Sequence, residues 1–179
     1  MTTLDKASEQ SLTSVIPELA ALWKRVFNSM WAQHEMKMKI TDSYRSMNKQ
    51  NQLYSLGRCK AQNGQWLIID SRKIVTWALP GSSYHQYALA VDACFVGADP
   101  YLERIDKKHA QFLWSEYGRM CIANGLEWGG SWHHPDRPHC QLSFGLTLNE
   151  LQGLHKTSGV PGVWDKCHAI MKEKNLILV

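Results

Sequence analysis

Apolar residues recur at helical spacing in two long segments of the chain. In 11–31 they fall on one face, and Pro17 suits the first turn of a helix, so we expect a helix that begins near Pro17. Residues 106–124 form a second amphipathic pattern, which Gly125 should end. Both patterns predict helices with one buried and one exposed side.

Shorter segments show strand patterns. MKMKIT (36–41) alternates apolar and basic residues, and LAVDACFV (89–96) is rich in β-branched and aromatic residues. We also expect strands at 126–128 and 139–144. Within the segment 59–82, QNGQWLIID (62–70) can form either a hairpin arm or a loop insertion, and its glycine and polar residues indicate that it lies on the surface.

Two short helices complete the predicted elements. One covers 47–57 with Gly57 at its end, and the last covers 147–155 with Thr147 as its cap. Strands and helices do not alternate regularly, which indicates an α+β fold with a small antiparallel sheet covered by helices. We expect a single domain over 1–155, with 156–179 as a tail of unknown role.

Composition narrows the class of protein. The chain has 179 residues and 44% hydrophobic residues, which is enough for one hydrophobic core. Its five cysteines are widely spaced without a C-x-x-C pair, so we expect neither a disulfide framework nor a thiolate zinc site. We expect no signal peptide and no membrane span, because the start lacks a basic and apolar pattern and no apolar run is long enough. The net charge of +4 suits an anionic partner.

Three residues could converge on a metal ion. His85 precedes the 89–96 strand, Asp92 lies within it, and His139 begins another strand, on the same face as Gln141. Asp92 interrupts an apolar strand, where a buried carboxylate needs a charged partner. If the two strands are neighbours, two imidazoles and one carboxylate leave a fourth position for water, as in catalytic zinc sites.

Hydrolysis at such a site also needs a proton carrier and a cation. Asp136 lies three residues before His139, and Glu127 is the competing candidate for the acid/base. Arg45 is the candidate for stabilising an oxyanion. We interpret most other histidines as surface residues, and leave open whether His133 or His134 reaches the metal.

These residues lie in three ordered motifs that resemble the family of zinc D-Ala-D-Ala carboxypeptidases and L-alanyl-D-glutamate endopeptidases. The motifs are SSYHQYALAVD, ITDSYRSMNKQNQLYSLGR and GLEWGGSWHHPDRPHCQL, and the resemblance covers about residues 17–155. It implies the small zinc peptidase fold of the hedgehog and D-Ala-D-Ala peptidase group. The whole of 1–155 would then be one zinc peptidase domain.

Residue by residue, the resemblance implies a role for each motif position. It implies one Zn²⁺ held by His85, Asp92 and His139, with Asp136 as the catalytic acid/base because the D-R-P-H form matches the endopeptidase branch. Glu127 becomes structural on this interpretation. We expect three residues to contact substrate: Arg45, Ser83 and Gln50.

The sequence departs from the family pattern at two places. Ala88 stands where the signature has glycine, and Asp42 with Ser43 replaces a small residue and glycine. Neither change removes a chemical group. The segment 60–73 is longer than usual and could rim the substrate groove.

The endopeptidase branch contains phage endolysins and bacterial wall-remodelling enzymes. The resemblance therefore implies a monomeric enzyme that cleaves peptidoglycan stem peptides between L-alanine and D-glutamate. As a phage endolysin it would be made in the host cytoplasm and reach the wall after holin-mediated release. The alternatives are a D-Ala-D-Ala carboxypeptidase or dipeptidase, and a zinc-stabilised module that binds peptidoglycan without cutting it. A nucleic-acid-binding domain is disfavoured, because clustered basic residues with interleaved aromatics are absent.

Overall fold

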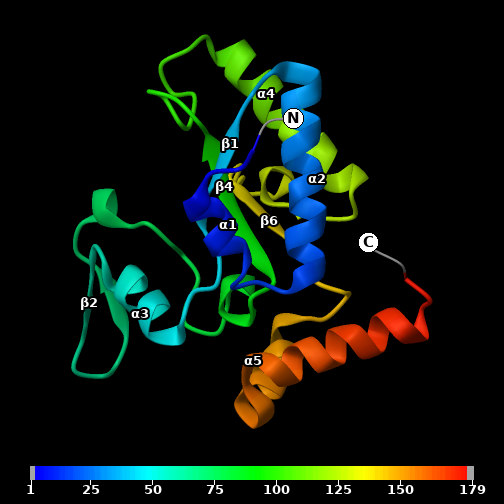
Figure 1. Cartoon of the computed structure of the whole chain (residues 1–179). Helices are drawn as coiled ribbons and strands as arrows, with labels where there is room; N and C mark the ends of the chain where they lie inside the picture. Colours follow the sequence, from blue (N-terminus) through cyan, green and yellow to red (C-terminus); the bar gives the residue numbers. More distant parts are fainter. Residues whose placement is uncertain (1–2, 177–179) are drawn as a thin grey trace.

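A computed structural model describes residues 3–176 as a small mixed sheet-and-helix domain with a side lobe (Figure 1). The α-helices are α1 (Lys6–Leu12), α2 (Pro17–His34), α3 (Met47–Ser55), α4 (Lys107–Ala123) and α5 (Leu148–Glu173). The strands are β1 (Met38–Asp42), β2 (Arg58–Lys60), β3 (Trp66–Ile68), β4 (Ala90–Phe95), β5 (Glu127–Trp128) and β6 (His139–Gln141). Three 3₁₀ turns are η1 (Ser71–Lys73), η2 (Tyr84–Tyr87) and η3 (Gly129–Ser131). The predicted α+β class is confirmed.

The main sheet is antiparallel, with the strand order β1-β4-β6-β5. Strand β4 lies between β1 and β6, so its apolar residues are buried on both sides of the sheet. The pairing sets Asp92 opposite Asp42 on β1 and opposite His139 on β6. The β1 register shifts between Ile40 and Asp42, which indicates a bulge at the end of the strand nearest the site.

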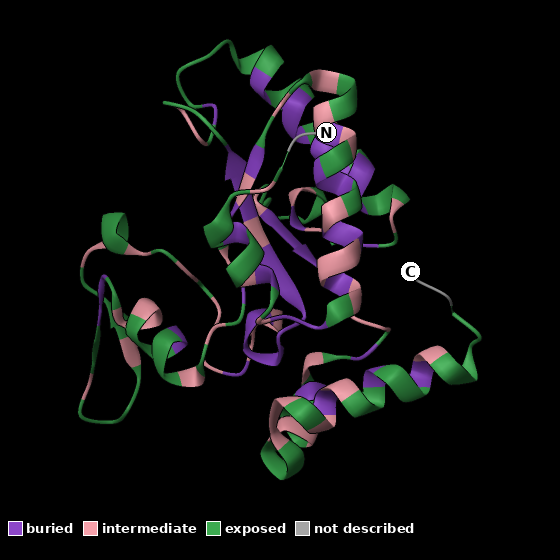
Figure 2. Ribbon diagram, in the orientation of Figure 1, coloured by how far each residue is buried: buried purple, intermediate pink, exposed green. Residues whose placement is uncertain are grey.

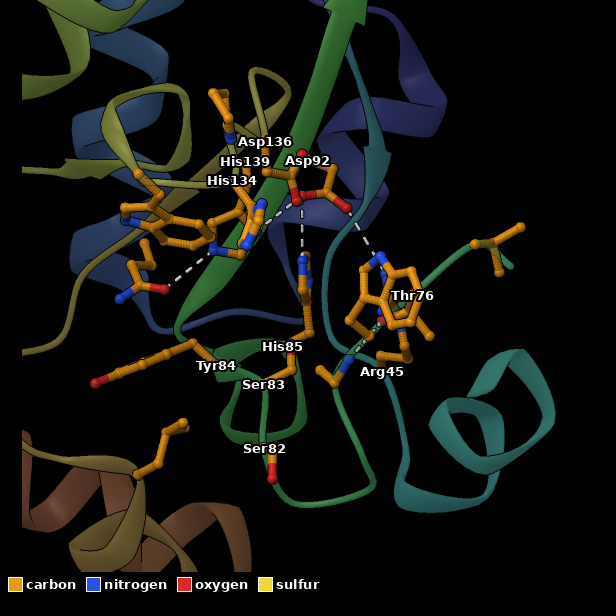
Figure 3. A pocket seen from close by; sticks show the side chains of 17 residues that line it. Arg45, Thr76, Ser82, Ser83, Tyr84, His85, Asp92, His134, Asp136 and His139 are labelled. Carbon is orange, nitrogen blue, oxygen red and sulfur yellow. Dashed lines mark hydrogen bonds and ion pairs between the residues drawn. The ribbon is translucent and has the colours of Figure 1, made fainter. Parts of the chain in front are cut away.

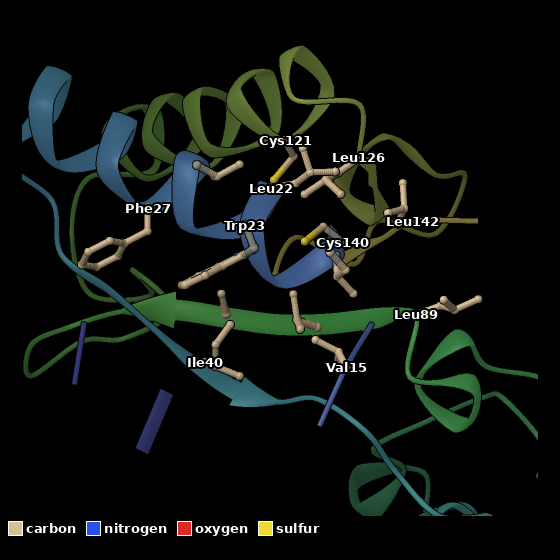
Figure 4. Packing of buried hydrophobic residues seen from close by; sticks show 14 of the residues in the cluster. Val15, Leu22, Trp23, Phe27, Ile40, Leu89, Cys121, Leu126, Cys140 and Leu142 are labelled. Atoms are coloured by element: carbon tan, nitrogen blue, oxygen red, sulfur yellow. The ribbon is translucent and has the colours of Figure 1, made fainter. Parts of the chain in front are cut away.

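Helices α2 and α4 cover one face of the sheet (Figures 1 and 4). Trp23 on α2 donates a hydrogen bond from Nε1 to the hydroxyl of Tyr117 on α4 at 3.2 Å, which joins the two helices in the core. Figure 2 shows buried residues concentrated along these helices and β4. At the edge of β1 that does not pair with β4, the buried Ser8 of α1 accepts a hydrogen bond from the Ile40 amide at 2.8 Å. Helix α1, capped by Asp5, was not predicted from the sequence.

The side lobe consists of α3, the β2–β3 hairpin, η1 and the segment 74–79 that follows it (Figure 1). Of the two alternatives for 62–70, the hairpin arm is therefore confirmed, with Trp66–Ile68 as the strand that pairs with β2. Arg58 anchors the lobe: it is 6% exposed and donates to the carbonyl oxygens of Tyr54 and Thr76 at 2.6 and 3.1 Å. Gly57, with φ of +73°, could not carry a side chain, because a Cβ would approach Asp70 O to 2.2 Å.

Helix α5 begins with the predicted Thr147 cap, but its predicted end at residue 155 is wrong. Gly159 adopts a non-helical φ of 64°, which kinks the helix, and the chain then continues as helix to Glu173. Val163, Cys167 and Ile170 of this second part are buried, so it packs on the domain. Residues 177–179 of the expected tail lie outside the described residues.

None of the helices within residues 3–176 has the length and hydropathy to span a bilayer.

Candidate metal centre

An open cavity of about 1220 Å³ lies where β4, β6 and η2 meet (Figure 3). Its lining includes most of the residues that the sequence singled out: Arg45, Ser83, His85, Asp92, Asp136 and His139. These residues come from five different segments of the chain. The antiparallel sheet and the short turn η2 are what bring them together.

The turn η2 carries His85 and positions it at the wall of the cavity. Its C-terminal cap, Ala88, adopts left-handed φ and ψ of 58° and 34°, a conformation that glycine adopts more easily than alanine. The Ala88 carbonyl accepts a hydrogen bond from the Ile16 amide at 3.0 Å, which ties the turn to α2. The departure from the family's glycine is therefore accommodated, and His85 remains buried in the turn.

His85, Asp92 and His139 converge on one point. Asp92 Oδ1 lies 3.2 Å from His85 Nε2 and 3.0 Å from His139 Nδ1. One potential ligand atom from each residue lies within 4.8 Å of the others. Two imidazole nitrogens and one carboxylate oxygen are a donor set that suits zinc, so the residues fit the metal implied by the motifs.

The electrostatics of the cluster favour a cation. Burial alone would raise the pKa of Asp92, but the charges and hydrogen bonds of His85 and His139 outweigh it and hold that pKa well below its usual range. Burial would likewise lower the pKa of His139, yet the hydrogen bond to Asp92 and its charge raise it to about 9. The carboxylate of Asp92 is thus stabilised by positive charge on the residues around it, which suits a site for a cation.

The backbone around β1 fixes the His85 ring. His85 Nδ1 donates to the Ser43 carbonyl at 2.7 Å, which leaves Nε2 to face Asp92. The Arg45 amide in turn donates to the His85 carbonyl at 3.0 Å. The segment 43–45 therefore holds both the side chain and the main chain of His85.

Arg45 lies on the wall of the cavity within a network of acceptors. Its Nε and Nη2 donate to Asp42 Oδ2 at 3.1 and 2.6 Å, and Nη2 lies 3.6 Å from Asp92 Oδ2. Its Nη1 donates to Gln50 Oε1 at 2.8 Å. A guanidinium carries five N–H groups, so Arg45 can still donate to a substrate oxygen.

Gln50 does not line the cavity, contrary to our expectation of a substrate contact. It is completely buried, and its amide nitrogen donates to the Ala78 carbonyl at 2.6 Å. Its amide oxygen accepts from Arg45 and from Gln86. Gln50 thus positions Arg45 against the loop 76–78 from within the protein.

The loop 129–138 carries Asp136 into the cavity. The Asp136 amide donates to the Gly129 carbonyl at 3.0 Å, and Trp128 Nε1 donates to the Arg137 carbonyl at 2.8 Å. Partial burial raises the pKa of the Asp136 carboxyl, and the charge of Asp92 adds to that rise. Asp136 stands outside the three-residue cluster, as expected for a proton carrier that is not a ligand.

Glu127, the competing acid/base, lies differently. Its carboxylate accepts hydrogen bonds from Gln141 and Ser143, and it is not among the residues that line the cavity. This position favours Asp136 for proton transfer. Ser83 does line the cavity, and so does His134, whereas His133 does not.

Sequence reasoning missed the aromatic walls of the cavity. Trp77 is 72% exposed and Trp132 is 41% exposed, and both line the cavity. The guanidinium of Arg58 lies 5.0 Å from the Trp77 ring centroid, and the Trp132 ring lies 5.1 Å from that of His139. Their positions depend on the lobe and the 129–138 loop, whose paths no local pattern predicts.

Comparisons with known proteins agree with the motifs. Residues 78–142 match a family model described as D-alanyl-D-alanine carboxypeptidase. The chain is 33% identical over 108 residues to the peptidoglycan L-alanyl-D-glutamate endopeptidase CwlK of Bacillus subtilis. That match covers 58% of this chain and 59% of the relative's length. The resemblance to the zinc D-Ala-D-Ala carboxypeptidase and L-alanyl-D-glutamate endopeptidase family is therefore confirmed.

Two solved structures also resemble the chain. The L-Ala D-Glu endopeptidase ChiX of Serratia marcescens is 22% identical, with 78% of this chain and 88% of that chain covered and a TM-score of 0.49. A mutant of the vancomycin-resistance D,D-pentapeptidase VanY, in complex with Zn(II), is 15% identical, with 79% and 78% covered and a TM-score of 0.47.

Proposed function

We propose that this chain, a relative of the zinc D-Ala-D-Ala carboxypeptidases and L-alanyl-D-glutamate endopeptidases, is a zinc peptidase that cleaves the L-alanyl-D-glutamate bond of peptidoglycan stem peptides. The observation that carries this proposal is the convergence of His85, Asp92 and His139 at the wall of an open cavity that Asp136 also lines. The similarity to CwlK supports the choice of bond.

His85, Asp92 and His139 would hold one zinc ion through Nε2, Oδ1 and Nδ1. When bound, zinc lowers the pKa of a coordinated water toward neutrality and polarises a carbonyl. The three residues supply one negative charge in total, from Asp92, so the loaded site keeps a net positive charge. That charge suits a reaction in which an oxyanion develops.

Asp136 supplies proton transfer in this mechanism. Its carboxylate accepts the proton of the attacking water and delivers a proton to the departing nitrogen of D-glutamate. The raised pKa of this carboxyl fits the second half of that role, because a stronger base holds the proton until the amine leaves. Its loop position, outside the ligand cluster, leaves the carboxyl free to do so.

Arg45 orients the substrate carbonyl and stabilises the charge that develops on its oxygen. Asp42 and Gln50 hold the guanidinium in place, which reduces the cost of ordering it when substrate binds. Ser83 and Trp77 contact the peptide along the same cavity. Trp77 offers a large apolar surface that Arg58 keeps in a fixed orientation.

The physiological role that we propose is that of a phage endolysin. The support is the D-R-P-H form of the Asp136 motif, which matches the endopeptidase branch that contains phage endolysins. Synthesis would take place in the host cytoplasm, and a holin would then give the enzyme access to the wall. The net charge of +4 favours contact with an anionic envelope. We expect the enzyme to act as a monomer.

The rival is a D-Ala-D-Ala carboxypeptidase, which the description of the matching family model favours. Two defined substrates separate the functions: a stem tetrapeptide that starts with L-Ala-D-Glu, and a pentapeptide that ends with D-Ala-D-Ala. Mass spectrometry of the products should show free L-alanine and a peptide that begins at D-glutamate. Release of the terminal D-alanine alone would select the carboxypeptidase. Zinc binding without any product would select a binding module.

A further inference from the structure

We propose that Gln141 and Glu127 form a relay that fixes the tautomer of His139, so that its Nδ1 is the nitrogen presented to the metal. Both are positioning residues, and the inference rests on the proposed role of His139 as a zinc ligand. The relay uses only side chains of this chain. It runs from His139 through Gln141, which also lines the cavity, to Glu127, which does not.

The relay is a continuous series of hydrogen bonds. His139 Nε2 lies 3.0 Å from Gln141 Oε1, and Gln141 Nε2 lies 2.9 Å from Glu127 Oε2. The Ser143 hydroxyl donates to the other oxygen of Glu127. The sheet builds this arrangement, because Gln141 pairs with Glu127 across β5 and β6, and His139 lies two residues earlier on the same face.

The carboxylate sets the direction of every bond in the series. An ionised Glu127 can only accept, so the amide nitrogen of Gln141 must face it. The amide oxygen of Gln141 then faces His139 and can only accept. His139 Nε2 must therefore carry a hydrogen, so the nitrogen that would give up its proton to bind the metal is Nδ1, which faces Asp92.

His85 is fixed in the opposite sense by a different device. Its Nδ1 donates to the Ser43 carbonyl, so its Nε2 is the free nitrogen. A main-chain carbonyl cannot reverse, whereas an amide side chain can. The His139 tautomer therefore depends on Glu127, and the His85 tautomer does not.

The packing keeps Glu127 in position. The ring of its neighbour Trp128 fills a slot beside Gly118 and Gly130, where a Cβ would approach the ring to 2.2 and 2.1 Å. Gln141 is 5% exposed, so water competes little for its amide. Glu127 itself is exposed, and its carboxylate can be changed without disturbing the core.

The test measures zinc affinity by competition with a chelator, in four proteins: wild type, Gln141→Met, Glu127→Lys and the double variant. Gln141→Met keeps the volume but removes the relay, and should weaken zinc binding about 10- to 100-fold. In Glu127→Lys the new ammonium group is a hydrogen-bond donor, so the Gln141 amide should reverse to place its oxygen toward the lysine and its nitrogen toward His139. This reversal should weaken zinc binding by a similar factor. In the Gln141→Met background the amide is absent, so Glu127→Lys should change the zinc affinity only slightly, through its charge.

The zinc-loaded wild type should also show an imidazole N–H signal for His139 at Nε2 in nitrogen-15 NMR, with slow exchange that Gln141→Met accelerates. Thermal unfolding of each metal-free variant controls for folding. An unchanged zinc affinity in Gln141→Met, or an equal effect of Glu127→Lys in both backgrounds, would overturn the relay. A wild type that binds zinc but cleaves no stem peptide would overturn the proposed function and leave the relay intact.

Discussion

The metal cluster and the side lobe are built in contrasting ways, although both border one cavity. Two of the cluster residues lie on paired strands: Asp92 and His139 face each other across β4 and β6, and both histidines are buried. The lobe carries exposed apolar residues on its short hairpin and on the segment that follows η1, where Trp77 lies on the cavity wall. A few buried polar side chains, chiefly Arg58 and Gln50, fix the lobe.

The contrast indicates that the two regions have different roles, metal binding for the cluster and substrate recognition for the lobe. Ligands must be held within tenths of an ångström, and a sheet in the core provides that precision. A surface that recognises substrate must stay open, so its apolar residues cannot be buried in the protein. We therefore expect changes in the cluster to abolish chemistry, and changes in the lobe to weaken substrate binding while chemistry continues.

The largest effect is expected from His139→Ala. The substitution removes one of two imidazole donors and leaves Asp92 with less positive charge to balance it. Zinc content should fall to a small fraction per chain, and hydrolysis of the stem peptide should fall at least about 10³-fold. Metal analysis and product formation measured on the same sample check this. Retained stoichiometric zinc would remove His139 from the ligand set.

Asp136→Asn should separate chemistry from metal binding. The amide cannot accept a proton, so the rate should fall about 10²- to 10⁴-fold. Zinc affinity should stay within about twofold, because Asp136 is not one of the three clustered residues. Near-normal turnover in this variant would return the acid/base role to Glu127.

Trp77→Ala tests the lobe. Loss of about 60 Å² of apolar contact, at about 25 cal/mol per Å², costs about 1.5 kcal/mol and should raise KM roughly tenfold with little change in kcat. Leu67→Ala is the matched control, because Leu67 is exposed on the same lobe but does not line the cavity. Equal kinetics in the two variants would show that Trp77 does not contact substrate.

The smallest effect should come from Glu116→Gln, because Glu116 lies in neither the metal cluster nor the side lobe. This effect concerns stability and not catalysis. Glu116 on α4 accepts hydrogen bonds from Arg119 and His34, and Arg119 chiefly lowers its pKa to about 2 from its usual 4.5. Ionised Glu116 therefore stabilises the fold above about pH 4.5, and this contribution is lost as the pH falls toward 2. Melting temperatures of the variant should decline less over that range. An identical decline in both proteins would contradict the pairing.

Much of the metal cluster could be predicted from local patterns. The alternation of β6 puts His139 and Gln141 on one face, and Asp92 is conspicuous within the apolar β4 strand. The motif SSYHQYALAVD also contains both His85 and Asp92, and the short separation between them in the sequence keeps them close in space. What the sequence could not provide is the direction of the Gln141 amide, which depends on Glu127 from another strand.

The path of the chain after residue 155 was also beyond local reasoning. Gly159 and Pro161 indicate the end of a helix, but a single non-helical residue suffices to redirect it. The second half of α5 then packs by long-range contacts, such as the hydrogen bond from Trp164 Nε1 to the Tyr87 carbonyl at 3.3 Å. The burial of Gln50 could not be predicted for a similar reason, because its amide group bonds to residues distant in the sequence, Ala78 and Gln86.

The central claim is that the His85, Asp92 and His139 cluster holds one zinc ion on which hydrolysis depends. The most direct measurement adds zinc stepwise to metal-free protein and follows bound zinc and cleavage of the L-Ala-D-Glu bond together. We expect the rate to rise in proportion to bound zinc and to reach a plateau at one ion per chain. Full cleavage in the metal-free protein, or a rate that does not follow zinc occupancy, would contradict the account.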